Sequence, residues 1–373
     1  MSDDLILTLK EIKGKFEEYY GRSPGTDDFV TAFAPNYGDE ILVQMVYAMR
    51  KIGIPDDTIY AYYQSDGLLP CDQNIDLLSE VELKEYKALC EEYETRLNAD
   101  NENGHINSLQ FVVLSSSYIE ECVDYTIEAV ISSLNDFIHR HSENPSMFEY
   151  RMTSELDYCA FSALKTIRTL ESIQKLKEDY LTECIYTLGR SVFENYAYLC
   201  SINHDPHLFP KKLLPRIDSE NYSFATYPDG RINYAQVIHK NTGEQSSIRV
   251  HVGDLVSKLP SDIDRELYAI FYQTACQYVH VDIMSAKSYF STPDPFDEIN
   301  PALIAALIVC ALSNLVLLEI SEHKDVHPQF RQDIQFLCGE NLKEKLINSL
   351  ELANSDPEHQ NAILDLLIRR MAE

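Results

Sequence analysis

Apolar positions recur at helical spacing along most of the chain. In residues 1–97 three short amphipathic stretches are separated by turn residues. The last stretch opens with Ser79 and Glu82, which have the spacing of a capping box, in which the two side chains bond the free N–H groups of a helix start. The pattern predicts an N-terminal helical module over residues 1–97, with helices starting near Asp39, Asp56 and Ser79.

The next segment, residues 98–106, is polar and contains a glycine, so it is the expected linker. Apolar pairs then repeat every three to four residues from 107 to 141, which predicts one helix of roughly 50 Å at 1.5 Å per residue. Two further long helices are expected to end near Lys177 and Ile202. Consecutive long amphipathic helices are typical of an antiparallel bundle, and the bundle domain is predicted to span residues 107–373.

The period of the pattern changes at residues 221–253. Aromatic and β-branched residues gather in three runs, at Tyr222–Tyr227, Arg231–His239 and Ser246–Val252, with glycine-containing turn signals between them. We expect a three-stranded antiparallel β-meander inserted in the bundle. The preceding stretch, Asn203–Glu220, carries three prolines and is expected to be irregular.

Helical spacing returns after the predicted sheet, and one of the helices is unusually apolar. Ala302–Leu318 has no charged residue, and its length is at the short end of the roughly 17–25 residues that span a bilayer. Acidic residues flank both ends and no basic flank orients it, so we expect a helix buried in the bundle and no membrane span. The expected helices are Pro260–Phe290, Pro301–His323, Pro328–Ala353 and Pro357–Met371. The predicted fold class is mainly α: a long-helix antiparallel bundle, a small inserted meander and an N-terminal helical module.

Composition narrows the classes of partner. Sixty acidic residues against 31 basic ones give a net charge of −29. Because phosphate contacts draw on Lys and Arg, this excess argues against an extended nucleic-acid-binding surface, but it leaves room for a small enclosed anion pocket. The nine cysteines are odd in number, widely spaced and without a C-x-x-C pair, and no signal peptide is recognisable, so we expect reduced thiols in a cytoplasmic protein.

Two helical segments carry candidate chemistry. Arg190 and Glu194 share a helix face at i, i+4 spacing, as do Tyr272, Cys276 and His280 further along the chain. On a solvent-exposed face such a pair contributes only about 0.2–0.5 kcal/mol and implies no function. Near the bundle centre the same groups would hold an anion, and a histidine would act as acid or base near neutral pH. The spacing alone leaves both interpretations open.

Metal sites have weaker signals. Glu319, His323 and His327 have i, i+4, i+8 spacing, but Pro328 indicates that the helix has ended by then. A second cluster, His204-Asp205-Pro206-His207, is expected in a loop. We interpret both as polar residues at element ends and expect neither a metal nor a cofactor.

Residues Leu188–Tyr196 and Tyr272–His280 together resemble a large family of uncharacterised prokaryotic all-helical proteins. In that family a helix with the pattern L-x-R-S-x-x-E-x-Y is followed much later by Y-x-x-x-S-x-Y-x-H. The similarity covers roughly residues 150–345. The family in turn looks akin to the HEPN group of helical nucleases and defence proteins. HEPN ribonucleases carry their Arg and His on one helix, whereas Arg190 and His280 stand on different ones.

The resemblance implies that Arg190, Glu194, Tyr272 and His280 converge in the bundle. Arg190 would then bind a phosphate or stabilise negative charge, and His280 would act as general base or acid on a ribose hydroxyl. Glu194 would orient these groups and Tyr272 would stack on a base. The implied function is a metal-independent ribonuclease, or a nucleotide-binding effector, of a phage-defence or stress system. The alternative is a non-catalytic scaffold with a protein partner or a second copy of the chain.

Overall fold

The structure is a computed structural model of the 373-residue chain. The residues it describes are 14, 22–23, 39–65, 67–71, 74–99, 108–141, 152–279, 294–355 and 360–373. Helices account for most of this part, and its one sheet has three antiparallel strands, so the predicted fold class is confirmed.

The chain divides into two compact units. Unit 1 comprises residues 1–114 and 290–300, and unit 2 comprises residues 115–289 and 301–373. Most of the expected linker, 98–106, lies outside the described residues. That residues 1–97 form a domain of their own stays a prediction.

Unit 1 is built on short helices around an aromatic centre. The capping box predicted at Ser79 is present, because its side chain and that of Glu82 each bond the other residue's backbone N–H. Tyr60 and Phe296 pack edge to face with ring centroids 5.2 Å apart, which joins the late segment 290–300 to the early helices. The elements are α2 (Asp39–Lys51), α3 (Asp56–Gln64), the 3₁₀ turn η2 (Ile75–Leu77), α4 (Glu80–Leu97) and the first turns of α5 (Ser108–His141).

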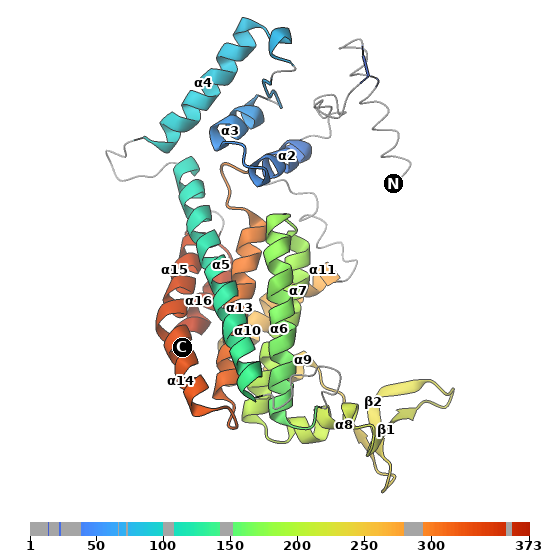
Figure 1. The fold of residues 1–373 in the computed structure, drawn as a ribbon. Helices are drawn as coiled ribbons and strands as arrows, with labels where there is room; N and C mark the ends of the chain where they lie inside the picture. The colour runs from blue at the N-terminus through green and yellow to red at the C-terminus, as the bar shows by residue number, and fades with distance from the viewer. Residues whose placement is uncertain are drawn as a thin grey trace. The chain divides into compact units, whose positions relative to one another are not determined.

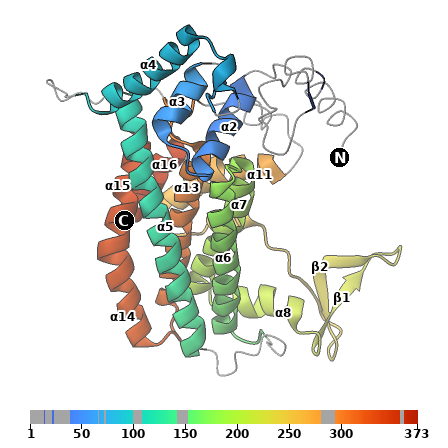
Figure 2. The same ribbon diagram turned by 45° about the horizontal axis from the view of Figure 1, so that its top comes forward.

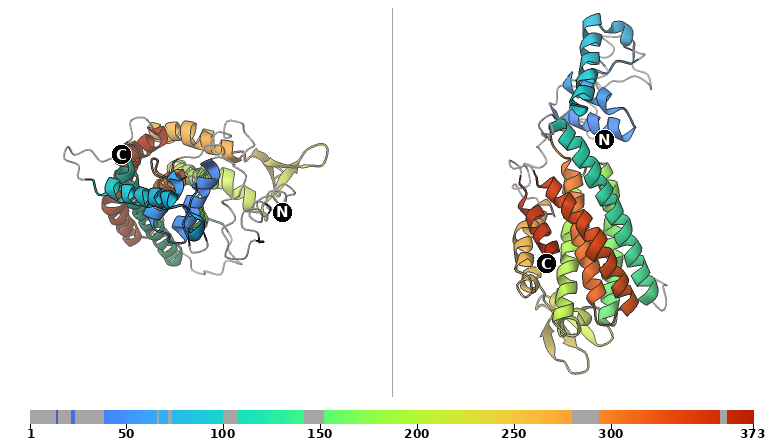
Figure 3. Two further views of the ribbon diagram at one scale, coloured as in Figure 1. Left: turned by 90° about the horizontal axis from the view of Figure 1, so that it is seen from above. Right: turned by 90° about the vertical axis from the view of Figure 1, so that its left-hand side faces the viewer.

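Unit 2 is the long-helix bundle, in which α13 (Pro301–Glu322) packs against α6 (Glu155–Glu178) and α7 (Thr182–His204). Figures 1 and 2 show α5, α6, α7 and α13 running side by side, and Figure 3 shows the bundle from above and from its left-hand side. The remaining α-helices are α8 (Leu214–Ile217), α9 (Val252–Val256), α10 (Asp262–Leu267), α11 (Gln273–Val279), α14 (Pro328–Phe336), α15 (Lys343–Ala353) and α16 (Ala362–Ala372).

The uncharged helix predicted from the sequence is α13. Its apolar stretch is long enough to cross a membrane by length and composition, and 83% of its most apolar window is buried inside the protein. Gly189 of α7 is required by this packing, because a Cβ there would lie 2.7 Å from Val309 Cγ2 and 3.2 Å from the Phe271 ring. Helix α13 therefore forms the core surface against which α7 packs closely.

Two of the predicted helices contain a π-helical turn that the sequence pattern did not reveal. One is η4 (Tyr268–Tyr272), between α10 and α11, and the other is η6 (Leu337–Leu342), between α14 and α15. A π turn adds a residue to the helix and rotates everything after it, and such turns are frequent at functional sites. In unit 2 the turn η4 contains Tyr272, one of the predicted site residues.

The stretch Asn203–Glu220 is more regular than predicted. Helix α7 continues to His204, and a π turn, η3 (Phe209–Leu213), leads directly into α8. Pro210 and Pro215 stand in the first two positions of these short helices, where a backbone N–H is not needed. The expectation of an irregular segment was therefore wrong.

The sheet has the order β1-β2-β3 and projects from the bundle next to α8 (Figures 1, 2 and 3). A bulge between Phe224 and Ala225 shifts the pairing of the first two strands. The third strand is shorter than predicted, and Lys212 and Arg216 bond the carbonyls of Ser247 and Ile248 at its end. The strands are β1 (Tyr222–Thr226), β2 (Ile232–His239) and β3 (Gln245–Ser247).

Candidate functional site

Three of the four predicted site residues meet in unit 2. Arg190 Nε donates to Glu194 Oε1 at 3.2 Å within α7, and the Tyr272 hydroxyl of η4 donates to the same oxygen at 2.8 Å. The Arg190 guanidinium lies over the Tyr272 ring at 5.2 Å from its centroid. We call these three residues the α7 flank cluster.

The α7 flank cluster is partly open to solvent. The side chains of Arg190 and Glu194 are 25% and 27% exposed, whereas Tyr272 is buried. Burial lowers the pKa of Arg190, but the hydrogen bond with Tyr272 and the charge of Glu194 outweigh it and raise that pKa above its ordinary value. Burial and the bond to Glu194 raise the pKa of Tyr272. At neutral pH the cluster therefore holds a charged guanidinium and a neutral phenol.

Local packing fixes these positions. Val192 and Phe193 turn one face of α7 into the core, which leaves Arg190 and Glu194 on the flank. The Phe193 ring contacts both Phe271 and Tyr272, with centroids 6.1 and 5.7 Å away. Phe271 and Tyr272, which are consecutive in the π turn η4, therefore both pack against Phe193 of α7.

A second cation, Lys165 of α6, belongs to this neighbourhood and was missed from the sequence. It is half-buried, and burial lowers its pKa although the nearby Glu194 carboxylate opposes this. On the same helix Ser162, Thr166 and Thr169 are buried, and Asn195 of α7 bonds Thr166. Lys165 is thus a second basic side chain whose pKa responds to the charge of Glu194.

The fourth predicted residue, His280, lies outside the described residues. Its neighbour on the predicted face, Cys276, is half-buried, and burial raises the pKa of its thiol although the charge of Arg190 opposes this. The general-base role assigned to His280 stays a prediction.

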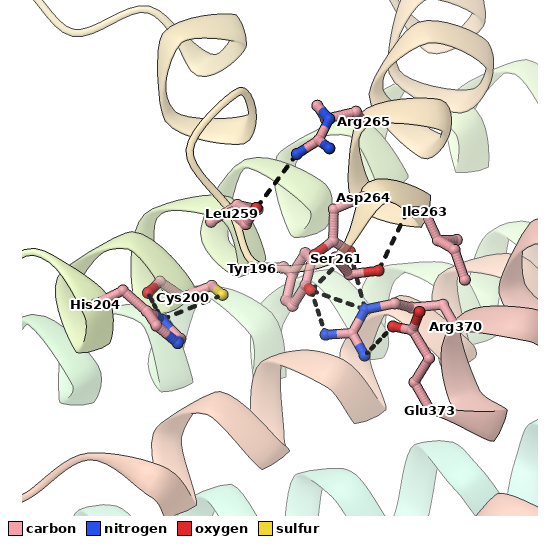
Figure 4. Close-up of polar contacts among 10 residues, drawn as sticks. All are labelled: Tyr196, Cys200, His204, Leu259, Ser261, Ile263, Asp264, Arg265, Arg370 and Glu373. Carbon is pink, nitrogen blue, oxygen red and sulfur yellow. Dashed lines mark hydrogen bonds and ion pairs between the residues drawn. The ribbon is translucent and has the colours of Figure 1, made fainter.

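A second Arg–carboxylate–Tyr network lies deeper in unit 2, and sequence reasoning missed it (Figure 4). Tyr196 of α7 donates its hydroxyl to Asp264 Oδ1 of α10 at 2.8 Å. Arg370 of α16 donates to the same oxygen at 3.0 Å and to the tyrosine hydroxyl at 2.8 Å. We call these three residues the core network.

The core network is closed to solvent at its centre. Tyr196 and Asp264 are fully buried and the Arg370 side chain is 19% exposed. Burial raises the pKa of Asp264, and the paired Asp264 and Tyr196 hold Arg370 in its charged form. Asp264 Oδ2 has no hydrogen-bond partner. The network joins three helices, and its carboxylate and phenol are fully buried, so it is a weaker candidate for a ligand site than the α7 flank cluster.

The residues best placed for a metal are Glu155, His323 and Asp325, whose ligand atoms lie within 4.8 Å of one another. Two observations argue against that use. Lys324 Nζ already contacts Glu155 at 2.7 Å, and His323 Nδ1 accepts the Asp325 N–H, so the proton of a neutral ring is on the Nε2 that faces Glu155. The set is thus satisfied without an ion.

Glu319, His323 and His327 do not share one helix, as Pro328 indicated, because α13 ends at Glu322. His327 instead caps α14, accepting the Gln329 N–H, while Glu319 accepts a bond from Asn203. The expectation that His323 is polar surface is wrong, since only 2% of it is exposed. All nine cysteines are free, and five of them are buried.

The comparisons with known proteins add no assignment: no family model, no curated protein and no solved structure matches this chain. The resemblance to HEPN-type proteins therefore stays an expectation from the two motifs, and the geometry of the α7 flank cluster is the ground on which a function is proposed.

Proposed function

We propose that the chain binds a phosphate group of RNA or of a nucleotide at the α7 flank cluster, as a HEPN-like effector of a prokaryotic defence or stress system. The observation that carries the proposal is the partly exposed guanidinium of Arg190, which Glu194 and Tyr272 hold in place. In a chain of net charge −29, a fixed and partly exposed guanidinium is a candidate site for an anion.

The chemistry of Arg190 suits this ligand. A guanidinium has five N–H donors in a planar fork, and the bond to Glu194 uses one of them. Glu194 and Tyr272 hold the side chain in place, so an arriving phosphate meets a preorganised donor group. Lys165 adds a second charge from α6, and its burial limits the water that would screen it.

Cleavage of RNA is the catalytic form of the proposal. His280 would take the proton from the ribose 2′-hydroxyl as that oxygen attacks the phosphorus, and would return it to the 5′-oxygen as the P–O5′ bond breaks. Arg190 would stabilise the charge on the phosphorane-like transition state. The tyrosine would position the base or sugar. Loss of cleavage in His280→Ala with retained RNA binding is the expected result, whereas intact RNA after long incubation with clean wild-type protein contradicts the catalytic form.

Binding is tested separately, with a labelled 12-nucleotide single-stranded RNA and with AMP as probes. Arg190→Gln is expected to weaken both affinities about tenfold or more, since it removes the charged fork and keeps a polar side chain of similar length. The matched control is Arg168→Gln, which removes a charge from an exposed position of α6. Equal affinities for wild type and Arg190→Gln would overturn the proposal.

A scaffold function is the second candidate, and one observation favours it. Glu194 Oε1 accepts from both Arg190 and Tyr272, so the cluster is internally satisfied and ties η4 to α7. A network of this kind fixes helix register without any ligand. This function predicts that neither probe binds while Tyr272→Phe loosens the contact between η4 and α7, which hydrogen exchange of the Tyr268–Tyr272 amides measures.

A further inference from the structure

The segment that contains α8 and the projecting sheet differs in charge from the rest of the protein, although the strands and turns from 222 to 247 hold two basic and two acidic residues. Residues 206–253, which we call the arm, hold six Lys and Arg against four Asp and Glu. The arm is therefore +2 in a chain of net charge −29, and the remaining residues sum to −31. Such a local reversal of sign is the pattern expected of a surface that meets an acidic one.

The arm also leaves large apolar side chains in solvent. Tyr227, Ile232 and Tyr234 are between 47% and 68% exposed, and Tyr234 stands in the part of β2 that the bulge leaves unpaired with β1. Arg231 lies over the Tyr227 ring and pairs with Asp229 at 2.8 Å, and its side chain is 79% exposed. Tyrosine and arginine are the residues that most often dominate binding energy at protein interfaces.

An acidic surface with matching aromatic residues exists on the same chain. Tyr118, Glu121, Tyr125 and Glu128 are all exposed on α5, and their spacing of three and four residues puts them on one helix face. We call this face the α5 stripe. Glu121 is 76% exposed, and its contact with Lys345 is a long one, at 3.4 Å. Lys345 also lies over the Tyr125 ring at 4.6 Å from its centroid, so Glu128 and the Tyr118 ring are the parts of the stripe outside these two contacts.

We propose that the arm of one copy of this chain docks on the α5 stripe of a second copy, and that the pair exchanges arms reciprocally. Within one chain the sheet projects away from the bundle, so the exposed tyrosines of the arm are not covered by their own α5 (Figures 1 and 2). Because each copy carries both an arm and a stripe, the exchange closes into a twofold dimer and leaves neither patch unpaired.

The contact has a defined chemistry. Arg231 and Arg249, which are exposed on the arm, meet Glu121 and Glu128, while Tyr234 packs against the rings of the stripe. Contacts of this kind combine a small aromatic centre with charged surroundings, so they weaken as salt rises. The dimer does not depend on the α7 flank cluster, whose residues lie on other faces.

Charge exchange tests this pairing in the full-length chain by sedimentation equilibrium. The variant Arg231→Glu/Arg249→Glu and the variant Glu121→Arg/Glu128→Arg are each expected to raise the dimer Kd about tenfold or more. Combining all four substitutions restores the opposite charges and is expected to return the Kd to within about threefold of wild type. Far-UV circular dichroism checks that each variant is folded.

Matched controls are Arg168→Glu and Glu171→Arg, which reverse exposed charges on α6 and should leave the Kd unchanged. A wild-type chain that is monomeric throughout the micromolar range overturns the proposal, as does a quadruple variant that dimerises no better than either double variant. If the arm variant instead loses single-stranded RNA binding while wild type stays monomeric, the occupant is nucleic acid and the dimer is wrong.

Discussion

Two networks in unit 2 each combine an arginine, a carboxylate and a tyrosine and share helix α7, yet their carboxylates differ in burial. In the core network Asp264 is fully buried, while in the α7 flank cluster the corresponding carboxylate, Glu194, is 27% exposed. A buried ion pair is costly to break, because the remaining charge is left without water or a partner. A partly exposed pair contributes little to stability and remains accessible to a ligand.

We therefore expect an Arg–carboxylate–Tyr network to have a different role when its carboxylate is buried than when it is partly exposed. The core network joins α7, α10 and α16, and its Asp264 and Tyr196 are fully buried. The α7 flank cluster joins α7 to η4 and keeps donors at the surface. The comparison predicts that stability depends on the first network and anion binding on the second.

The largest expected effect is on stability, from Arg370→Met. The substitution leaves Asp264 buried without its cation, so the free energy of unfolding should fall by about 3–5 kcal/mol. Arg190→Met, the matched change in the α7 flank cluster, should cost less than about 1 kcal/mol. Urea unfolding followed by circular dichroism measures both. Similar losses in the two variants would contradict the distinction drawn between the networks.

A double variant sharpens this result. In Asp264→Leu/Arg370→Met both charges are replaced by apolar groups of similar volume, so most of the lost free energy of unfolding should return. If the double variant is as unstable as Arg370→Met, the orphaned Asp264 charge is not the source of the loss.

The next largest effect on stability is expected from two neighbouring residues of α7, one in the core and one on the flank. Gly189→Ala should destabilise the protein by about 1–3 kcal/mol, because the new methyl group meets Val309 and Phe271 in the core. Arg190→Ala, one residue later on the flank, should stay within about 1 kcal/mol. Thermal unfolding distinguishes them, and an unchanged melting temperature in Gly189→Ala would show that α7 and α13 are less closely packed than described.

The two tyrosines allow a smaller comparison. Tyr196→Phe removes a donor to the buried Asp264 and an acceptor from Arg370, so it should cost about 1–3 kcal/mol. Tyr272→Phe removes one bond to the partly exposed Glu194 and should cost about 0.5–1.5 kcal/mol. The measurement is again urea unfolding, and a reversed order would contradict the assigned depths.

The smallest effect is a pH dependence of anion binding. Burial lowers the pKa of Lys165 below its ordinary 10.5, so the protonated form that attracts an anion is lost as the pH rises through that lowered value. The affinity for AMP should therefore fall about two- to fivefold on the alkaline side, the size expected of one partly screened charge. Lys165→Arg keeps its charge and should flatten the profile; a wild-type profile already flat would remove Lys165 from the site.

Much of the fold could be predicted because helical spacing and turn residues are local signals. The capping box at Ser79, the uncharged helix α13 and the three strands all followed from short stretches of sequence. The π turns could not, because a single inserted residue disturbs the apolar spacing too little to be seen. The prolines of 203–220 were interpreted as a sign of irregular structure. Pro210 and Pro215 instead stand in the first turns of η3 and α8, where a proline does not break a helix.

The candidate site, like the fold, was predictable only in part. Arg190 and Glu194 could be paired from their spacing, and their meeting with Tyr272 followed from a resemblance between motifs. Asp264 and Arg370 are 106 residues apart in the chain, and nothing local marks either one as buried. Lys165 was missed because Glu194, the charge that acts on it, stands on another helix and nothing in the local sequence marks the lysine.

The most direct test of the division of labour is calorimetric titration of AMP into wild type, Arg190→Gln and Asp264→Leu/Arg370→Met, with the folded fraction of each checked beforehand. The account predicts at least about tenfold weaker binding by Arg190→Gln and near wild-type binding by the double variant. Undiminished binding by Arg190→Gln, or loss of binding in the folded double variant alone, would contradict it.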